Sequence, residues 1–210
     1  LEPTHARHAA HYEAALRERK RLLADESEPD PRWLDSIELQ LAEAGAALAQ
    51  GRATLVEQLS GELAELPEAP FARPALVLAA SGPRDAEGLA RGFARERQRD
   101  RAAGRTLTGP HRDDLEVVMA GKGTPAASCS TGEQKALLIA LTLAHAALAA
   151  AGRPGVLLLD EVAAHLDPVR REALFERLGA GKAQVWLTGT ERAPFEAILA
   201  DAATWRVSGG

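Results

Sequence analysis

The 210-residue sequence is poor in cysteine and in aromatic side chains, and each shortage excludes a class of protein. A single cysteine, Cys129, excludes an internal disulfide framework, and no zinc ligand cluster of the CxxC type is present. Aromatic residues make up only 4% of the chain and alanine is abundant, which favours helices over an all-β sandwich or barrel. A reducing cytoplasm fits this composition best.

We also expect neither a membrane-spanning helix nor a secretory signal peptide. The longest apolar stretch, residues 136–151, contains Thr142 and His145 and is shorter than the ~20 residues that a membrane-spanning helix needs. We therefore expect a buried helix there. The chain begins at Leu1 without the basic, apolar and small-residue segments of a secretory peptide, and the missing methionine leads us to expect a fragment.

Charge is distributed unevenly around a mildly acidic total of −5. Residues 1–73 hold 8 basic and 14 acidic side chains, residues 74–112 hold 8 and 4, and residues 113–210 hold 9 and 12. The acidic total argues against non-specific coating of nucleic acid by the whole surface. The basic middle segment is the candidate for a local contact.

Three arginines in that segment recur every four residues, which places Arg91, Arg95 and Arg99 on one face of a helix. Such a face could bind DNA phosphates. The favoured alternative is a solvated face whose charges are paired within the helix by three acidic residues, namely Glu87, Glu96 and Asp100.

Hydrophobic spacing predicts a mostly helical lobe over residues 1–103 and an α/β part over residues 104–210. In the first lobe, apolar side chains at spacings of three and four predict helices over residues 4–24, 33–66 and 85–103. In the second part we expect helices at 131–151, 168–179 and 194–200 and strands at 156–159, 183–188 and 204–207. This alternation predicts a parallel sheet with covering helices.

Two adjacent carboxylates follow the strand expected at residues 156–159. A continuous apolar run is typical of a strand that is buried on both faces, and Asp160 and Glu161 emerge at its C-terminal end, where open α/β sheets bind ligands. One carboxylate there could hold Mg²⁺ on nucleotide phosphates, and its neighbour could orient or deprotonate a water molecule. The alternative is that the two acids cap the following turn.

Small and hydroxyl side chains precede the apolar helix. The segment 128–135 places Ser130 and Thr131 at a helix N-terminus, where free backbone N–H groups and the helix dipole favour phosphate. A plain cap is the alternative, with Ser130 or Thr131 as the N-cap and Glu133 in the first turn.

The order of these motifs resembles the ABC-type ATPases, in which a signature sequence opens a helix and is followed by a Walker B strand and a D-loop. Thr131 and Glu133 differ from the transporter consensus and are similar to the branch that includes SMC-like and RecF proteins. The three motifs are Ser130-Thr131-Gly132-Glu133-Gln134, Leu157 to Glu161, and Ala164-His165-Leu166-Asp167. Further similarity to the RecF family of bacterial DNA replication and repair proteins is carried by Tyr12 to Arg19, Leu107 to Leu115 and Gln184 to Thr190.

The chain has no phosphate loop of the form GxxxxGK[ST]. Gly121-Lys122 is followed by Gly123, and Gly181-Lys182 is followed by Ala183. In RecF-like proteins this loop and the first half of the sheet lie upstream. The resemblance therefore implies the C-terminal half of an ABC-type ATPase head, joined to a helical lobe, which we expect to be inactive without the missing lobe.

The resemblance also implies residue roles. Two heads would sandwich ATP, with Asp160 on Mg²⁺, Glu161 as the catalytic base and Asp167 at the dimer seam. The signature would bind the partner's nucleotide in trans through Ser130, Thr131, Gly132, Glu133 and Gln134. It further implies DNA binding at single-strand/double-strand junctions, the partners RecO and RecR, recombinase loading, and a place in repair, replication-fork maintenance and the SOS response.

Several alternatives remain open at this point. An SMC-like or RecN-like head and a non-catalytic interaction module are the competing functions. The Gly109-Pro110-His111-Arg112 turn could approach nucleotide or DNA, or it could pack against the sheet. We expect no metal at the three histidines of the first helix, and we expect Cys129 to be a small packed residue. The resemblance explains no role for His165, and we expect it to be an exposed residue.

Overall fold

The computed structural model describes residues 3–25, 30–67, 70–150, 153–164 and 166–208. The chain packs into two compact units. Unit 1 comprises Leu1–Gln58 and Leu76–Glu116, and unit 2 comprises Leu59–Ala75 and Val117–Gly210. These packing units are a different division from the domains predicted at residues 1–103 and 104–210, which remain a prediction about functional lobes.

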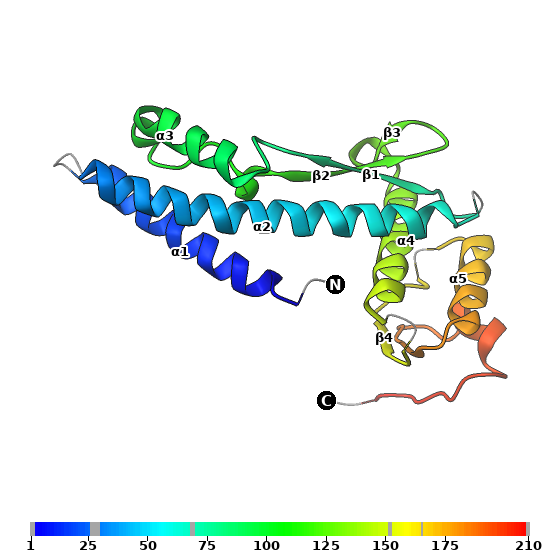
Figure 1. The fold of residues 1–210 in the computed structure, drawn as a ribbon. Coiled ribbons are helices and arrows are strands. Elements are labelled where there is room, and N and C mark those ends of the chain that lie inside the picture. The colour runs from blue at the N-terminus through cyan, green and yellow to red at the C-terminus, as the bar shows by residue number, and fades with distance from the viewer. Residues whose placement is uncertain (1–2, 26–29, 68–69, 151–152, 165, 209–210) are drawn as a thin grey trace. The chain divides into compact units, whose positions relative to one another are not determined.

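Unit 1 is built on three helices, as the spacing predicts. Helix α1 spans His5–Ala24, α2 spans Pro31–Ala64 as one continuous helix, and α3 spans Ala86–Ala103 (Figure 1). Helix α3 begins where the Asp85 side chain accepts the backbone N–H of Gly88, and it ends at Gly104, whose φ of 64° favours glycine. Apolar side chains from all three helices pack together in the core of unit 1: Tyr12, Ala15, Leu41, Leu48, Leu89 and Phe93.

A small sheet has three strands in the order β1-β2-β3, with β1 between α2 and α3 in the chain and the other two strands after α3. Strand β1 spans Pro74–Ala79, β2 spans Asp114–Met119 and β3 spans Thr124–Pro125. Strands β2 and β3 are antiparallel, and the turn between them carries Lys122 and ends at Gly123, whose φ is 61°. A short 3-10 helix, η1 (Pro110–Arg112), precedes β2.

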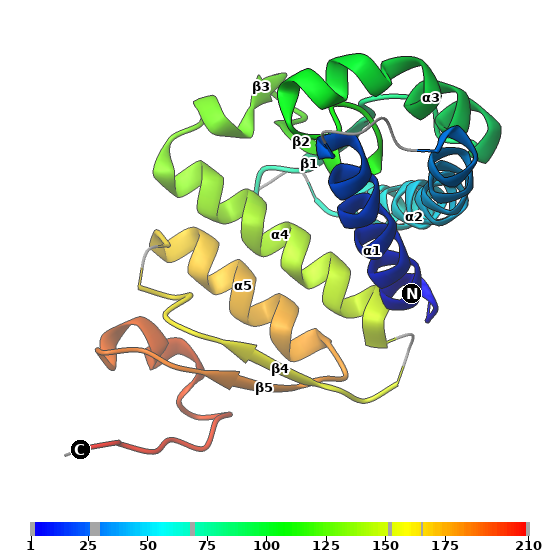
Figure 2. The same ribbon diagram turned by 90° about the vertical axis from the view of Figure 1, so that its left-hand side faces the viewer.

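Unit 2 contains the α/β part. A 3-10 helix η2 (Ala126–Ser128) leads into α4 (Thr131–Ala150), which is followed by β4 (Val156–Leu159), α5 (Pro168–Ala180), β5 (Gln184–Leu187) and the 3-10 helix η3 (Ala193–Ile198). Strands β4 and β5 are parallel, and Leu159 is opposite Leu187. Figure 2 shows α4 and α5 on one side of this sheet. The predicted parallel α/β arrangement with covering helices is confirmed.

One face of the β4–β5 sheet is largely exposed in the described part of the chain. We expected β4 to be buried on both faces, and this was wrong, because Val156 and Leu158 are 63% and 73% exposed. The helices cover the opposite face, where Leu157 and Leu187 join the core of unit 2. On the open face Trp186 stacks on Trp205, with 5.5 Å between the ring centroids.

Other local expectations also need correction. Helix α4 is buried along one face, whereas Leu138 on another face is 63% exposed. Residues 204–207 form no strand, and the helix expected at 194–200 is the 3-10 helix η3. No helix in the described part of the chain is long and apolar enough to cross a membrane.

Candidate functional site

The two carboxylates predicted at the end of β4 lie beside the end of β5. Because the strands are parallel and in register, Thr188 at the end of β5 is a neighbour of Asp160. The Thr188 hydroxyl donates a hydrogen bond to Oδ1 of Asp160. The same hydroxyl oxygen accepts the backbone N–H of Glu161 at 3.2 Å. Thr188 therefore contacts both acidic residues.

Glu161 has a strained backbone. Its φ is 51°, and it is the one non-glycine residue in the described part of the chain with a positive φ. Residues other than glycine rarely adopt this conformation, and such strain is concentrated at functional sites. The hydrogen bond from Glu161 to Thr188 helps to hold this conformation.

The oxygen donors at this strand end suit a hard cation. Asp160 is exposed, and the Thr188 hydroxyl lies against its carboxylate. Mg²⁺ is bound in proteins by one or two carboxylates together with substrate phosphates and water. Within the described residues no group of three or more His, Cys, Asp or Glu side chains is arranged to hold a metal ion. A role of Asp160 in holding Mg²⁺ on a nucleotide remains a prediction.

The signature residues form a capping box at the start of α4. Oε2 of Glu133 accepts the backbone N–H and the hydroxyl of Ser130, each at 2.9 Å. The other carboxylate oxygen, Oε1, contacts Nζ of Lys122 at 2.6 Å. The hydrogen bond to Lys122 is the main cause that lowers the pKa of Glu133 to about 2, and the hydrogen bonds to Ser130 add to it. The structure thus contains the cap that the sequence allowed, with Ser130 as the N-cap. A phosphate-binding role for these residues remains a prediction.

The D-loop aspartate caps the next helix. Asp167 accepts the backbone N–H of Arg170 at 3.0 Å, and this hydrogen bond lowers the pKa of Asp167. The Arg170 guanidinium lies 3.2 Å from Asp167 and donates to the carbonyl of Pro70. A Cβ at Gly132 would lie 3.8 Å from the same guanidinium. The Arg170 guanidinium therefore lies near Gly132 as well as against Asp167. His165 lies outside the described residues.

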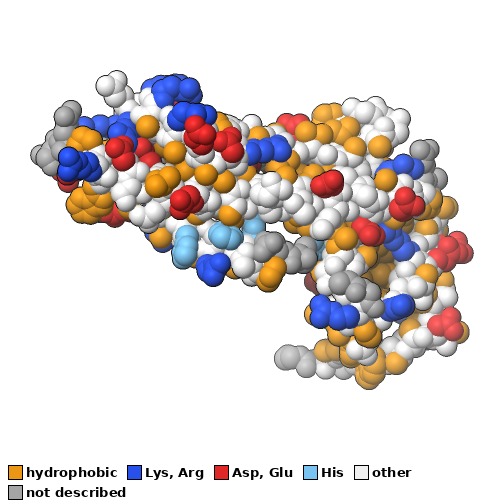
Figure 3. Space-filling view, viewed as in Figure 1, with side chains coloured by type: hydrophobic (Ala, Val, Ile, Leu, Met, Phe, Trp, Pro, Cys, Tyr) orange, Lys and Arg blue, Asp and Glu red, His pale blue; other side chains and the backbone are white. Residues whose placement is uncertain are grey.

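The arginine stripe of α3 is exposed and paired. Arg91 contacts Glu87, while Arg95 and Arg99 contact Glu96 at 3.2 and 2.8 Å. Basic and acidic side chains accordingly lie side by side over α3 in Figure 3. The solvated face is the arrangement seen here, and the DNA contact remains a prediction.

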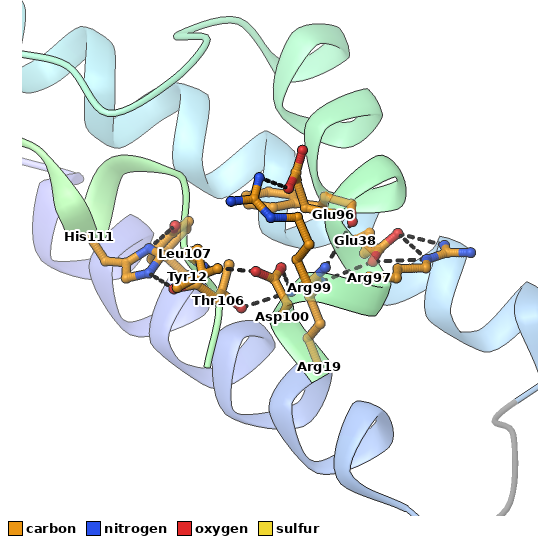
Figure 4. Close-up of polar contacts among 11 residues, drawn as sticks. Tyr12, Arg19, Glu38, Glu96, Arg97, Arg99, Asp100, Thr106, Leu107 and His111 are labelled. Carbon is orange, nitrogen blue, oxygen red and sulfur yellow. Dashed lines mark hydrogen bonds and ion pairs between the residues drawn. The ribbon is translucent and has the colours of Figure 1, made fainter. Parts of the chain in front are cut away.

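Asp100 is not the partner on this face that we expected. It is buried, and its carboxylate contacts the guanidinium of Arg19 at 2.7 Å (Figure 4). Arg19 also contacts Glu38 at 2.9 Å and donates to Thr106 and to the carbonyl of Phe93. This buried network was not foreseen. The signal was present, because position 19 continues the apolar face of α1 that contains Tyr12, Ala15 and Leu22.

The Gly-Pro-His-Arg turn packs within unit 1. Nε2 of His111 faces the carbonyl of Thr106 at 3.0 Å, so it carries the proton, and Nδ1 accepts the hydroxyl of Tyr12 at 2.8 Å. Burial lowers the pKa of His111 and favours this neutral form. The Arg52 guanidinium donates to the carbonyl of Pro110. These contacts favour the structural interpretation of the turn.

Comparison with known proteins defines the class. The protein family described as "AAA domain, putative AbiEii toxin, Type IV TA system" matches residues 17–188. This match extends from α1 to the end of β5 and includes the signature and the carboxylates. The chain belongs to this AAA-domain family.

The similar proteins include RecF proteins, the family that the motifs resemble. The chain is 47% identical to the DNA replication and repair protein RecF of Brucella abortus and 46% identical to RecF of Caulobacter vibrioides, over 100% and 98% of its length. It spans 58% of each of these relatives. A solved structure of the recombination mediator protein RecF-ATP in the RecFOR pathway matches 91% of the chain with a TM-score of 0.74 at 21% identity, covering 55% of that structure. The predicted resemblance to RecF is confirmed.

Proposed function

We propose that this chain is the C-terminal portion of a RecF-like, DNA-binding ATPase of recombinational repair and replication-fork maintenance. The acidic residues Asp160 and Glu161 at the end of β4 carry this proposal, and Thr188, after β5, links the Asp160 carboxylate to the Glu161 backbone N–H. The RecF relatives support it, as does the fold shared with an ATP-bound RecF. Because the chain has no phosphate loop, the site works only together with a segment that supplies one. We call that combination the loop-containing protein.

Asp160, Glu161 and Thr188 would have different roles in hydrolysis. Asp160, with the Thr188 hydroxyl beside it, would hold Mg²⁺ on the nucleotide. Bound Mg²⁺ neutralises developing negative charge on the transferred phosphoryl group. Glu161 would orient the attacking water and accept its proton. The Thr188 hydroxyl contacts both the Asp160 carboxylate and the Glu161 backbone N–H. It would therefore fix the position of both residues at the end of β4.

The signature would act on a second copy. Ser130 offers a hydroxyl and Gly132 allows close backbone approach, both at the positive end of the α4 dipole. Each signature would therefore reach the γ-phosphate of nucleotide held by the partner, with Asp167 at the seam. ATP would close a dimer on DNA, and hydrolysis would release it.

The wider role rests on the same resemblance. We expect the loop-containing protein to bind single-strand/double-strand DNA junctions and to assist recombinase loading with RecO and RecR in the cytoplasm. The arginine face of α3 is the candidate DNA contact, provided that its arginines exchange their glutamate partners for phosphates.

Separating the two carboxylates tests the proposal. In the loop-containing protein, Asp160→Asn should weaken Mg²⁺-dependent nucleotide binding and hydrolysis together. Glu161→Gln should retain binding while hydrolysis falls by roughly 10²–10⁴-fold, since it removes the base and retains the shape. ATP-bound dimers should then accumulate, as measured by analytical ultracentrifugation with ATP and Mg²⁺.

Adding Ser130→Arg to Glu161→Gln should abolish these dimers, because a bulky side chain at the start of α4 blocks access to the partner's nucleotide. A Glu161→Gln protein that stays monomeric, or a double variant that still dimerises, would contradict the trans arrangement. Full hydrolysis by Glu161→Gln would show that Glu161 is not the catalytic base.

A further inference from the structure

Lys122 connects the β2–β3 turn to the first turn of α4. Its Nζ lies 2.6 Å from Oε1 of Glu133, and Oε2 of the same carboxylate accepts the N–H and the hydroxyl of Ser130. One carboxylate is thus shared between a lysine from the hairpin and the N-cap of the signature helix. Nothing in the hydrophobic pattern or in the signature motif points to this lysine.

The arrangement matters because the Ser130 hydroxyl has a single proton to donate. In the structure that proton is given to Glu133. When the hydroxyl turns to a phosphate, Glu133 loses this hydrogen bond and keeps its contacts with the Ser130 N–H and with Lys122. The arriving phosphate then lies close to a carboxylate, and like charges at such distances repel by about 1 kcal/mol or more.

We propose that Lys122 is a positioning residue for the signature: it neutralises Glu133 and holds it in the cap while the Ser130 hydroxyl turns to the γ-phosphate of the partner's nucleotide. This inference rests on the proposed function. Lys122 acts through Glu133, and not as a ligand of the phosphate.

A purely structural role of Lys122 predicts a different result, namely a loss of folding stability. The Lys122 side chain is 64% exposed and that of Glu133 is 20% exposed, so their ion pair adds little to folding stability. In the structure, the capping contacts between Glu133 and Ser130 involve no atom of the lysine. Loss of Lys122 should therefore affect nucleotide-dependent association far more than unfolding.

A double-mutant cycle measures this coupling. In the Glu161→Gln loop-containing protein with ATP and Mg²⁺, Lys122→Met should weaken dimerisation about tenfold, which corresponds to about 1.4 kcal/mol of lost charge compensation. Lys122→Arg should restore dimerisation to within about threefold, because it keeps the charge. In a Glu133→Gln background, Lys122→Met should cost less than about twofold, because no carboxylate is left to neutralise.

Lys182→Met is the matched control, since Lys182 is also an exposed lysine that follows a glycine between two elements. It should leave dimerisation unchanged, and thermal unfolding should be similar for all of these variants. An equal loss with and without Glu133 would show that Lys122 acts directly on phosphate and would overturn the inference, as would no loss for Lys122→Met. A parent protein that does not dimerise with ATP would reject the proposed function, and this inference with it.

Discussion

Thr188 shows how much of the site depends on one neutral side chain. Its hydroxyl group donates to Asp160 and accepts from the backbone of Glu161, whose φ of 51° is unfavourable by itself. A hydroxyl has one donor and two acceptor positions, so threonine can make both contacts at once. No other side-chain hydrogen bond to either acid is present in the described part of the chain.

Thr188→Val should therefore lower the free energy of unfolding by about 0.5–1.5 kcal/mol, because the isosteric methyl group removes both hydrogen bonds. Thr188→Ser keeps the hydroxyl and is the matched control, with a much smaller loss. Urea unfolding of the 210-residue chain measures the difference. Equal stability of the valine and serine variants would show that the hydroxyl does not hold the turn.

At the scale of elements, the three helices of unit 1 are joined by a buried arginine. Arg19 from α1 reaches Glu38 in α2 and Asp100 in α3, and its guanidinium lies 5.4 Å from the centre of the Phe93 ring. At the rim, Arg97 adds a second cation to Glu38 at 2.5 Å. These pairs fix which helix faces meet, since a buried charge without a partner is costly.

Arg19→Met should destabilise the chain by about 3–5 kcal/mol, because the carboxylate of Asp100 would stay buried without its cation. Arg17→Met is the control on the same helix, since the Arg17 side chain is 73% exposed and contacts the exposed Glu13. Its effect should stay within about 0.5 kcal/mol. Chemical denaturation compares the two, and a tolerant Arg19→Met chain would show that packing alone aligns the helices.

The outer face of α3 gives a separate test of DNA binding. Replacing Arg91, Arg95 and Arg99 by alanine in the loop-containing protein should weaken binding and reduce the salt slope by up to about three counterions. The measurement is DNA affinity across a salt series. If the slope does not change, the arginines serve only the glutamate-paired face seen in the structure.

For the whole molecule, the missing phosphate loop decides the activity of the chain as given. Asp160 and Glu161 stand at the strand end without the loop that would present a nucleotide to them. The purified 210-residue chain should therefore release phosphate from ATP at no more than the background rate. Steady turnover that Glu161→Gln abolishes would prove this wrong.

The sequence alone was sufficient to locate the main helices and the strand β4, and to show the kinship with RecF. The three- and four-residue spacing of apolar side chains located α1 to α3, the apolar run located β4, and the signature and Walker B motifs pointed to RecF. These signals are local, because helix and strand periods act over a few residues. The absent phosphate loop could likewise be seen from spacing alone.

Only the tertiary structure decided which distant side chains meet. Arg19 pairs with Asp100, 81 positions away, and Thr188 joins Asp160 across 28 positions. Lys122 reaches Glu133 because a hairpin turn returns the chain to the start of α4. The strand β4 looked buried on both faces, yet its exposure depends on what covers the sheet. The sequence does not show whether a charged side chain is buried with a partner or exposed to solvent, because both depend on tertiary packing and not on the local pattern.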